Sequence, residues 1–214
     1  HGKVVVANNS YYEDDYLGKT ADGRLGEWDG KKWTIIDRNP YVEVSGKHWY
    51  SPYYGSVIYA TGWDRGSVIL KFYKNGIWKT YRLPKASYAY DQAWNTEWMR
   101  IFYELPTLTN NNNIMGIRPI AKHLSLVPDF CYWRGMFVMA GDQNDRSNGQ
   151  PQSGLWFGNI DELWQMGKPK GWGGPWYESD VKAYEVSDPF LMTGFDSKSL
   201  HITHNANREI VFKV

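Results

Sequence analysis

Cysteine is almost absent from this sequence, since Cys131 is the only one among 214 residues. A single cysteine excludes a framework of internal disulfides and a zinc site built on several cysteines. Long apolar runs are missing as well, because no stretch approaches the ~18 residues of a membrane-spanning helix. We therefore expect no membrane span.

Charge of one sign does not accumulate anywhere along the chain. Lys and Arg number 24 against 23 for Asp and Glu, which leaves a net charge of +1. The two signs are interspersed, whereas nucleic-acid-binding proteins gather positive charge on one face or stripe. The sequence therefore argues against a nucleic-acid partner.

Aromatic residues are abundant by contrast. They make up 17% of the chain, with 12 Trp and 16 Tyr. Flat rings pack well on the pleated faces of β-sheets. They also stack on the C–H face of a sugar ring, so this composition suits both a β-rich core and a polysaccharide or oligosaccharide partner.

An apolar run recurs along the chain and ends each time near a Gly, Asp or Asn. The copies are Val4–Asn9, Val57–Asp64, Phe137–Asp142 and Phe190–Asp196, with a weaker copy at Phe102–Pro106. They recur about every 46 residues, the size of a propeller blade of about four strands. We therefore expect an all-β fold in which residues 1–214 form a single β-propeller domain of four-stranded antiparallel blades.

These copies would supply about five blades, whereas we expect a ring of about seven. The strand-like run Glu209–Val214 stops without a returning strand, and the stretch Trp98–Tyr103 joins two strand-like runs without a turn residue. We therefore expect further segments of the ring beyond the ends and within the chain.

Two dipeptides predict tight hairpins, Asp29-Gly30 and Asn75-Gly76. Both central residues of such a turn need positive φ, which these residue types adopt readily. Three tryptophans follow the second strand of a copy at comparable positions: Trp33, Trp78 and Trp164. We expect them to be buried between blades, where replacement by Ala costs about 3–5 kcal/mol.

Several longer stretches carry a family resemblance. They are Ala93–Ile101, Phe102–Pro106, Gly116–Leu124, Val127–Cys131, Gly149–Gly158, Gly171–Trp176 and Ser187–Asp196. With them the chain resembles an uncharacterised family of bacterial secreted β-propeller proteins, which implies a secreted, periplasmic or cell-surface location. At the level of the fold it is also similar to propeller polysaccharide lyases and glycosidases that cut uronate- or rhamnose-containing glycans.

Equivalent positions after each apolar run should converge at one mouth of a propeller channel. The predicted substrate-binding residues occupy these positions: Asp64, Asp142, Gln143, Asp196 and Trp63. Their carboxylate and amide groups suit sugar hydroxyls, and Trp63 would stack on a sugar ring. A ring of such oxygens also suits Ca²⁺, while no other cofactor is expected. The alternative is that the Asp side chains cap tight turns.

Arg118 and His123 are the predicted catalytic pair of a polysaccharide lyase. The guanidinium of Arg118 would neutralise a uronate carboxylate and so acidify the C5 proton, which His123 would remove. The two residues are five positions apart, so their side chains point to opposite faces of a regular strand. A bulge between them would bring both to one face.

Other residues offer alternative chemistry. His48 lies in the aromatic stretch Gly46–Gly55 just before an apolar run and is a further catalytic candidate, although it also fits an exposed loop histidine. Hydrolysis would need two carboxyls about 5–10 Å apart. The candidates for that pair are Asp64, Glu97, Asp142 and Asp196. No His or Cys pattern predicts a metal centre.

Two functions remain open at this stage. The first is an extracellular carbohydrate-active enzyme that cuts a complex uronate- or rhamnose-containing polysaccharide by β-elimination or hydrolysis. The alternative is a non-catalytic propeller that binds glycans or proteins. The enzyme predicts His with Arg, or two carboxyls, in a pocket where pKa values are shifted. The binding protein predicts flat aromatic platforms instead.

Overall fold

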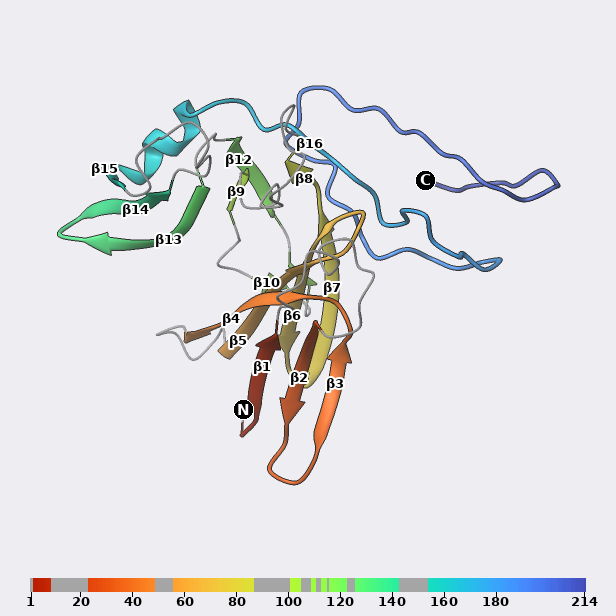
Figure 1. Ribbon diagram of the computed structural model, residues 1–214, viewed down its shortest axis with the longest axis horizontal. Helices are drawn as coiled ribbons and strands as arrows, with labels where there is room; N and C mark the ends of the chain where they lie inside the picture. Colours follow the sequence, from red (N-terminus) through yellow and green to blue (C-terminus); the bar gives the residue numbers. More distant parts are fainter. Residues whose placement is uncertain are drawn as a thin grey trace.

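The computed structural model describes residues 2–8, 23–48, 56–86, 101–104, 109–110, 113–114, 116–122, 126–142 and 154–214. Within these ranges the protein is all-β, with several small antiparallel sheets and one short 3-10 helix, η4 (Ile160–Gln165). The expected all-β class is therefore confirmed. The sheets are separate and do not close into a ring (Figure 1), so the propeller stays a prediction.

The largest sheet is a four-stranded meander. Its strands follow one another in chain order as β4 (Tyr41–His48), β5 (Ser56–Trp63), β6 (Val68–Lys74) and β7 (Ile77–Leu83). β6 is buried on both faces: Leu70 and Phe72 point into one apolar cluster, and Ile69 points into another. The sheet is thus the centre of the described protein, with other elements packed on each side.

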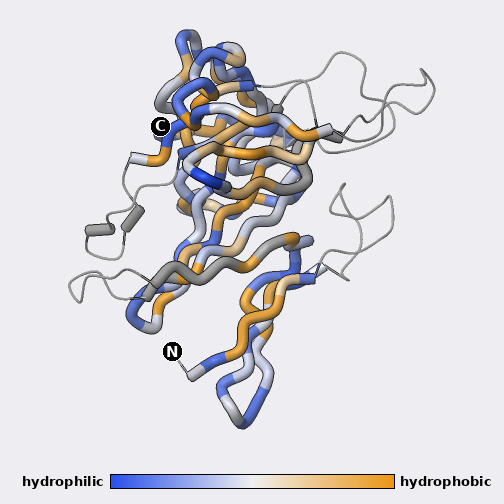
Figure 2. Tube along the Cα trace, turned by 90° about the vertical axis from the view of Figure 1, so that its left-hand side faces the viewer, coloured by the Kyte–Doolittle hydropathy of each residue, from blue (hydrophilic) through white to orange (hydrophobic). Residues whose placement is uncertain are grey.

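The N-terminal sheet covers one face of this centre. It consists of β1 (Val4–Asn8), β2 (Arg24–Trp28) and β3 (Trp33–Asp37). Leu25 of β2 is fully buried in the same apolar cluster as Ile69. Figure 2 shows this sheet as a layer of its own beside the rest of the chain.

A second group of strands lies beyond the other face. The two-stranded sheet of β9 (Ile101–Glu104) and β12 (Arg118–Lys122) adjoins the sheet of β13 (Leu126–Trp133), β14 (Met136–Asp142) and β15 (Gly154–Gly158). Leu163 of η4 packs with Phe137 and Met139 of β14. The remaining strands form two short pairs, β10 (Thr109–Asn110) with β11 (Asn113–Ile114) and β8 (Lys85–Ala86) with β16 (Gly171–Trp172).

Both predicted dipeptides lie in hairpin turns, but of the two only Asn75-Gly76 has positive φ at both residues. Asn75 and Gly76 have φ of 53° and 85° and join β6 to β7. Gly30 has φ of 97°, and the Oδ1 atom of Asp29 accepts hydrogen bonds from the backbone N–H of Lys31 at 2.8 Å and of Lys32 at 2.9 Å. The turn at Asn75-Gly76 forms as expected because its geometry depends on two adjacent residues. The other hairpin has a longer loop, residues 29–32, between the paired Trp28 and Trp33.

The predicted apolar runs take different places in the sheets. Val4–Asn8, Val57–Trp63 and Phe137–Asp142 lie in strands, as expected. β1 lies at the edge of its sheet, whereas β5 and β14 each have a neighbour on both sides. The reason is that the residues before each run, which form β4 and β13, also pair as strands.

The predicted strand at Phe190–Asp196 is wrong. Its only strand-like pairing is an isolated bridge between Phe190 and Arg82, and the described residues 173–214 contain no strand. The backbone N–H of Arg82 donates to the carbonyl of Pro189 at 2.8 Å, and that of Leu191 donates to the carbonyl of Arg82 at 2.9 Å. After this contact, Gly194 at φ of 90° turns the chain out of the extended conformation.

The three tryptophans do not share one environment. Trp33 is 57% exposed and Trp164 is 45% exposed, so their predicted burial between blades is wrong. Trp164 lies in η4, where no strand forms. Trp78 does lie between two sheets: it packs beside Ile69 and Leu25, and its Nε1 donates to Glu27 at 3.2 Å.

Candidate functional site

The side chain of Arg118 lies on an exposed surface made by β9, β12 and η4. Arg118 pairs directly across the strands with Glu104, and its Nε lies 2.5 Å from the Oε2 of that residue. The guanidinium carbon also lies 4.7 Å from the centre of the Trp164 ring. We call these three residues the Arg118 surface.

Among the described residues, the guanidinium of Arg118 has a single hydrogen-bond partner, Glu104. The side chains of Arg118 and Glu104 are 55% and 45% exposed, and Trp164 is 45% exposed. Within the described ranges, the only hydrogen bond from this guanidinium is the one from Nε to Glu104. The outer edge, with its two Nη atoms, has the geometry that binds a carboxylate through two parallel hydrogen bonds.

The strand that carries Arg118 is bulged. Arg118 and Pro119 lie opposite Glu104 and Tyr103, but Ala121 lies opposite Phe102, so Ile120 is an extra residue in β12. A bulge of one residue reverses the alternation of side chains beyond it. This irregularity is the condition under which we expected Arg118 and His123 to act together. His123 lies outside the described residues, so its role stays a prediction.

Two segments from the C-terminal part of the chain adjoin β12. The backbone N–H of Lys122 donates to the carbonyl of Gly167 at 3.4 Å, and a side chain at Gly194 would meet the ring of Pro119. Just beyond, Lys168 forms an ion pair with Asp196. The hydrogen bond from Lys168 lowers the pKa of Asp196. The structure therefore brings two predicted site residues, Arg118 and Asp196, to neighbouring segments around β12.

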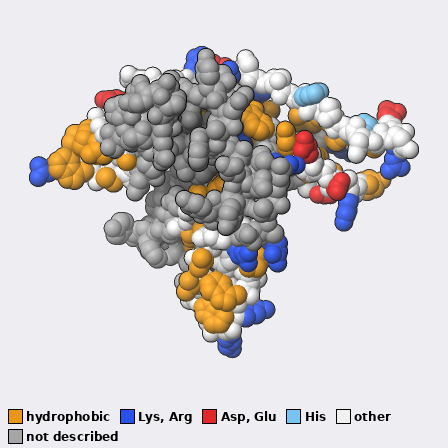
Figure 3. Space-filling view, in the orientation of Figure 1, with side chains coloured by type: hydrophobic (Ala, Val, Ile, Leu, Met, Phe, Trp, Pro, Cys, Tyr) orange, Lys and Arg blue, Asp and Glu red, His pale blue; other side chains and the backbone are white. Residues whose placement is uncertain are grey.

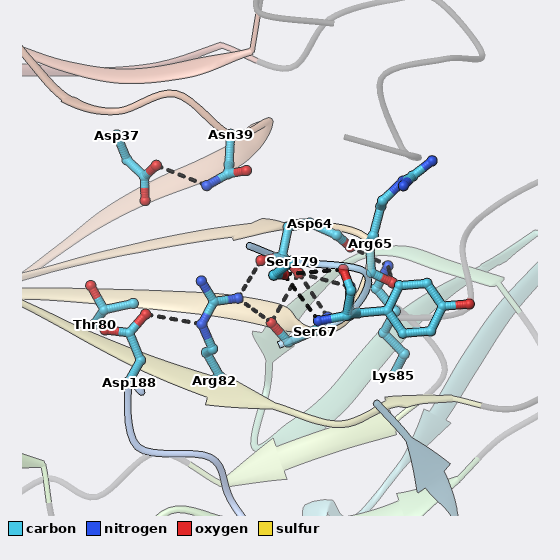
Figure 4. A network of polar contacts seen from close by, with 12 residues as sticks. Asp37, Asn39, Asp64, Arg65, Ser67, Thr80, Arg82, Lys85, Ser179 and Asp188 are labelled. Atoms are coloured by element: carbon cyan, nitrogen blue, oxygen red, sulfur yellow. Dashed lines mark hydrogen bonds and ion pairs between the residues drawn. The ribbon is translucent and has the colours of Figure 1, made fainter. Parts of the chain in front are cut away.

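Asp64 serves a different network, drawn in Figure 4. Its Oδ1 accepts hydrogen bonds from the backbone N–H groups of Gly66 at 2.9 Å and Ser67 at 2.8 Å, while Oδ2 pairs with Arg82. The Nη1 of Arg82 also donates to the Ser67 hydroxyl at 2.6 Å. Asp64 thus caps the turn between β5 and β6, which was the alternative role considered for it.

Arg82 links this turn to the C-terminal part of the chain. Its Nε donates to Asp188 at 2.9 Å (Figure 4). Burial disfavours the charged guanidinium, but the carboxylates of Asp64 and Asp188 outweigh that effect and raise the pKa of Arg82. Asp64, Ser67, Arg82 and Asp188, here called the Arg82 network, therefore hold residues 188–191 against β7.

The other predicted site residues are placed as follows. Trp63 ends β5 and is 6% exposed, so its ring packs inside the protein and offers little surface to a sugar. His48 and Asp142 end β4 and β14, and their side chains lie outside the described part of the chain, as does Gln143. Asp64 and Asp196 belong to two networks that share no residue. The roles in substrate binding or catalysis that were predicted for these six residues remain predictions.

An exposed aromatic face, which we did not predict, lies on the sheet of β13 to β15. Trp133 and Phe157 are 49% and 48% exposed, with ring centres 6.4 Å apart. The guanidinium of Arg134 lies 4.7 Å from the Trp133 ring. Figure 3 shows apolar side chains gathered over this hairpin with a cationic group at its tip. The continuous apolar run at Phe130–Trp133 is the signal that could have revealed it, because both faces of that strand then carry apolar groups.

Among the described residues, no three His, Cys, Asp or Glu side chains are grouped so that they could hold a metal ion. The described part of the chain also has no helix with the length and apolar character to span a membrane. The Ca²⁺ site at the ends of the apolar runs stays a prediction.

Comparisons with models of protein families, with curated proteins and with solved structures find no significant match to this chain. The resemblance to bacterial secreted propeller proteins therefore stays a prediction. Function has to be argued from the geometry of the described side chains.

Proposed function

We propose that this protein recognises acidic polysaccharides and that Arg118 binds the carboxylate of a uronate residue. The observation that carries the proposal is the open edge of the Arg118 guanidinium, beside the exposed ring of Trp164. The guanidinium matches a carboxylate in charge and in geometry. The indole adds an apolar surface on which a sugar ring can stack.

The reaction that this arrangement favours is β-elimination. Arg118 would neutralise the uronate carboxylate and lower the pKa of the neighbouring C5 proton. A base removes that proton, the C4–O bond breaks, its electron pair goes to the leaving oxygen, and that oxygen takes up a proton. The electrons of the broken C–H bond form the new C4–C5 double bond. His123 is the proposed base, and the bulge in β12 supports its joint action with Arg118.

A second candidate is glycan binding without catalysis. The exposed face with Trp133 and Phe157 favours it, since flat aromatic surfaces are what that function predicts. In both cases we propose that the consecutive meanders β1–β3, β4–β7 and β13–β15 are blades of a propeller. They support this because propeller blades are meanders in chain order.

The test is to incubate the protein with polygalacturonate and follow both binding and the ultraviolet absorbance of the unsaturated product. Arg118→Ala should weaken binding about 10- to 100-fold, because a charged hydrogen-bonded contact is worth about 1.5–3 kcal/mol. Arg118→Lys should recover only part of that, since Lys lacks the bidentate edge.

The matched control is Arg65→Ala, because Arg65 also pairs with an exposed glutamate, Glu178, at 2.9 Å. This variant should bind polygalacturonate as the unmodified protein does. Binding without an unsaturated product would favour the second candidate. Unchanged binding by folded Arg118→Ala would refute the proposal that Arg118 recognises the substrate.

A further inference from the structure

Within the part of the chain that the structure describes, the Arg118 guanidinium pairs with one carboxylate, that of Glu104. Glu104 occupies the Nε edge of the guanidinium at 2.5 Å, which leaves the Nη edge for one further anion. The guanidinium carbon lies 4.7 Å from the centre of the Trp164 ring. One carboxylate can therefore bind in the plane of the guanidinium.

Glu104 also places a negative charge next to the Nη edge of Arg118, where the ligand carboxylate would bind. Its carboxylate lies directly across from Arg118 in the sheet and is 45% exposed, so a ligand bound at Arg118 is close to it. Like charges a few ångströms apart repel each other enough to change an affinity several-fold, even in water. A second carboxylate on a neighbouring sugar would meet this repulsion, whereas a neutral sugar would not.

The third member of the surface favours a neutral neighbour as well. Trp164 is 45% exposed even though the Arg118 guanidinium lies over its ring, and its exposed apolar surface suits the C–H face of an uncharged sugar. Charge and stacking thus favour the same ligand pattern, namely one carboxylate followed by a residue without charge.

We infer that the Arg118 surface selects polysaccharides in which uronate residues are separated by neutral ones, and that Glu104 sets this selectivity. The inference rests on the proposed function, since it assumes that Arg118 binds a uronate carboxylate. It goes further by specifying how carboxylates are spaced along the preferred substrate and by naming Glu104 as the residue that discriminates between spacings.

Polygalacturonate with graded methyl esterification provides the test, because the backbone is constant and only the number of free carboxylates changes. The unmodified protein should bind a chain that is about half esterified roughly threefold more tightly than a fully de-esterified chain. A fully esterified chain should bind most weakly, because it offers Arg118 no carboxylate. Affinities are measured by titration calorimetry at fixed ionic strength.

The decisive variant is Glu104→Gln. The amide keeps an oxygen that can accept the hydrogen bond from Nε of Arg118 but removes the negative charge. It should strengthen binding of the de-esterified chain and abolish the preference for the half-esterified one. Glu178→Gln is the matched control, since Glu178 is 65% exposed and pairs with Arg65. That control should leave the preference unchanged.

The outcomes separate this inference from the proposed function. If Arg118→Ala abolishes binding but Glu104→Gln has the same preference as the unmodified protein, the selectivity inference is wrong and the proposed function stands. A preference of the unmodified protein for the de-esterified chain would also overturn the inference. If none of the three chains binds, both fail together.

Discussion

At the scale of the residue, two arginines on strands have different surroundings and therefore different roles. The side chain of Arg82 is 14% exposed and is held by two carboxylates, Asp64 and Asp188. Arg118 is 55% exposed, and among the described residues its guanidinium pairs only with Glu104. The sequence shows an arginine in a strand-like segment in both places. Only the partners that the fold supplies make the first one structural and the second one a binding candidate.

Asp29 provides a prediction about pH. The backbone N–H groups of Lys32 and Lys31 donate to its carboxylate and lower its pKa below the ordinary 3.8. A carboxyl group with a lowered pKa in the folded state stabilises that state above pH 3.8, and this stabilisation is lost as the pH falls through the folded value. Asp29→Ala should therefore reduce the free energy of unfolding more at about pH 7 than at about pH 2.

Urea unfolding at both pH values measures this difference. Lys31→Ala is the control, because it keeps the Asp29 carboxylate and the backbone N–H of residue 31 that donates to it. Equal destabilisation by Asp29→Ala at the two pH values would show that the carboxylate contributes nothing to the turn.

At the scale of the element, tight turns and strand edges are governed by different forces. The turn between β6 and β7 depends on Asn75 and Gly76, both at positive φ, and its tip is exposed. β5 instead ends against the chain that precedes β4: the N–H of Trp63 donates to the carbonyl of Pro40 at 3.1 Å, and Gly62 faces the Tyr41 ring. Backbone conformation thus decides which residues fit in the turn. At the end of β5, the space left by neighbouring atoms decides it.

Alanine substitutions at two glycines should separate these forces. At Gly76 no atom lies within 4 Å of an added Cβ, so only the φ of 85° opposes it, at a cost of about 1 kcal/mol. At Gly62 an added Cβ would overlap the Pro40 carbonyl oxygen, so overpacking should cost about 2–3 kcal/mol. Thermal and urea unfolding of both variants measure the difference, and a larger effect at Gly76 would contradict this account.

At the scale of the whole molecule, the central meander holds the surrounding segments in place. The N-terminal sheet packs on one face of it through Leu25 and Ile69, and Ile117 and Leu191 pack on the other. The C-terminal part is also attached where the backbone N–H of Gly174 donates to the carbonyl of Gly66 and where the Arg82 network binds residues 188–191. Beyond residue 191 the chain is largely exposed (Figure 1).

Loss of Arg82 should therefore weaken the whole assembly. Arg82→Met leaves Asp64 and Asp188 without their shared cation, and we expect a loss of about 2–3 kcal/mol, less than for a fully buried pair because Asp188 is 39% exposed. Arg65→Met removes a more exposed pair and should cost about 1 kcal/mol or less. Urea unfolding gives both values, and faster hydrogen exchange in residues 188–191 of the Arg82→Met variant would show that this segment detaches. Equal stability losses in the two variants would contradict the role assigned to Arg82.

The sequence by itself determined the all-β class and the positions of the turns at Asp29-Gly30 and Asn75-Gly76. It also determined most of the strands that were predicted from apolar runs. These features depend on a few adjacent residues, whose φ preferences and alternation are visible in the sequence. It also marked Arg118 as a candidate by residue type. Only the tertiary structure decided that Glu104 and Trp164 surround Arg118, that Asp64 binds Arg82, and that Phe190–Asp196 forms no strand. Each of these outcomes depends on which distant segments pack together, as with Arg82 and Asp188, which are 106 positions apart.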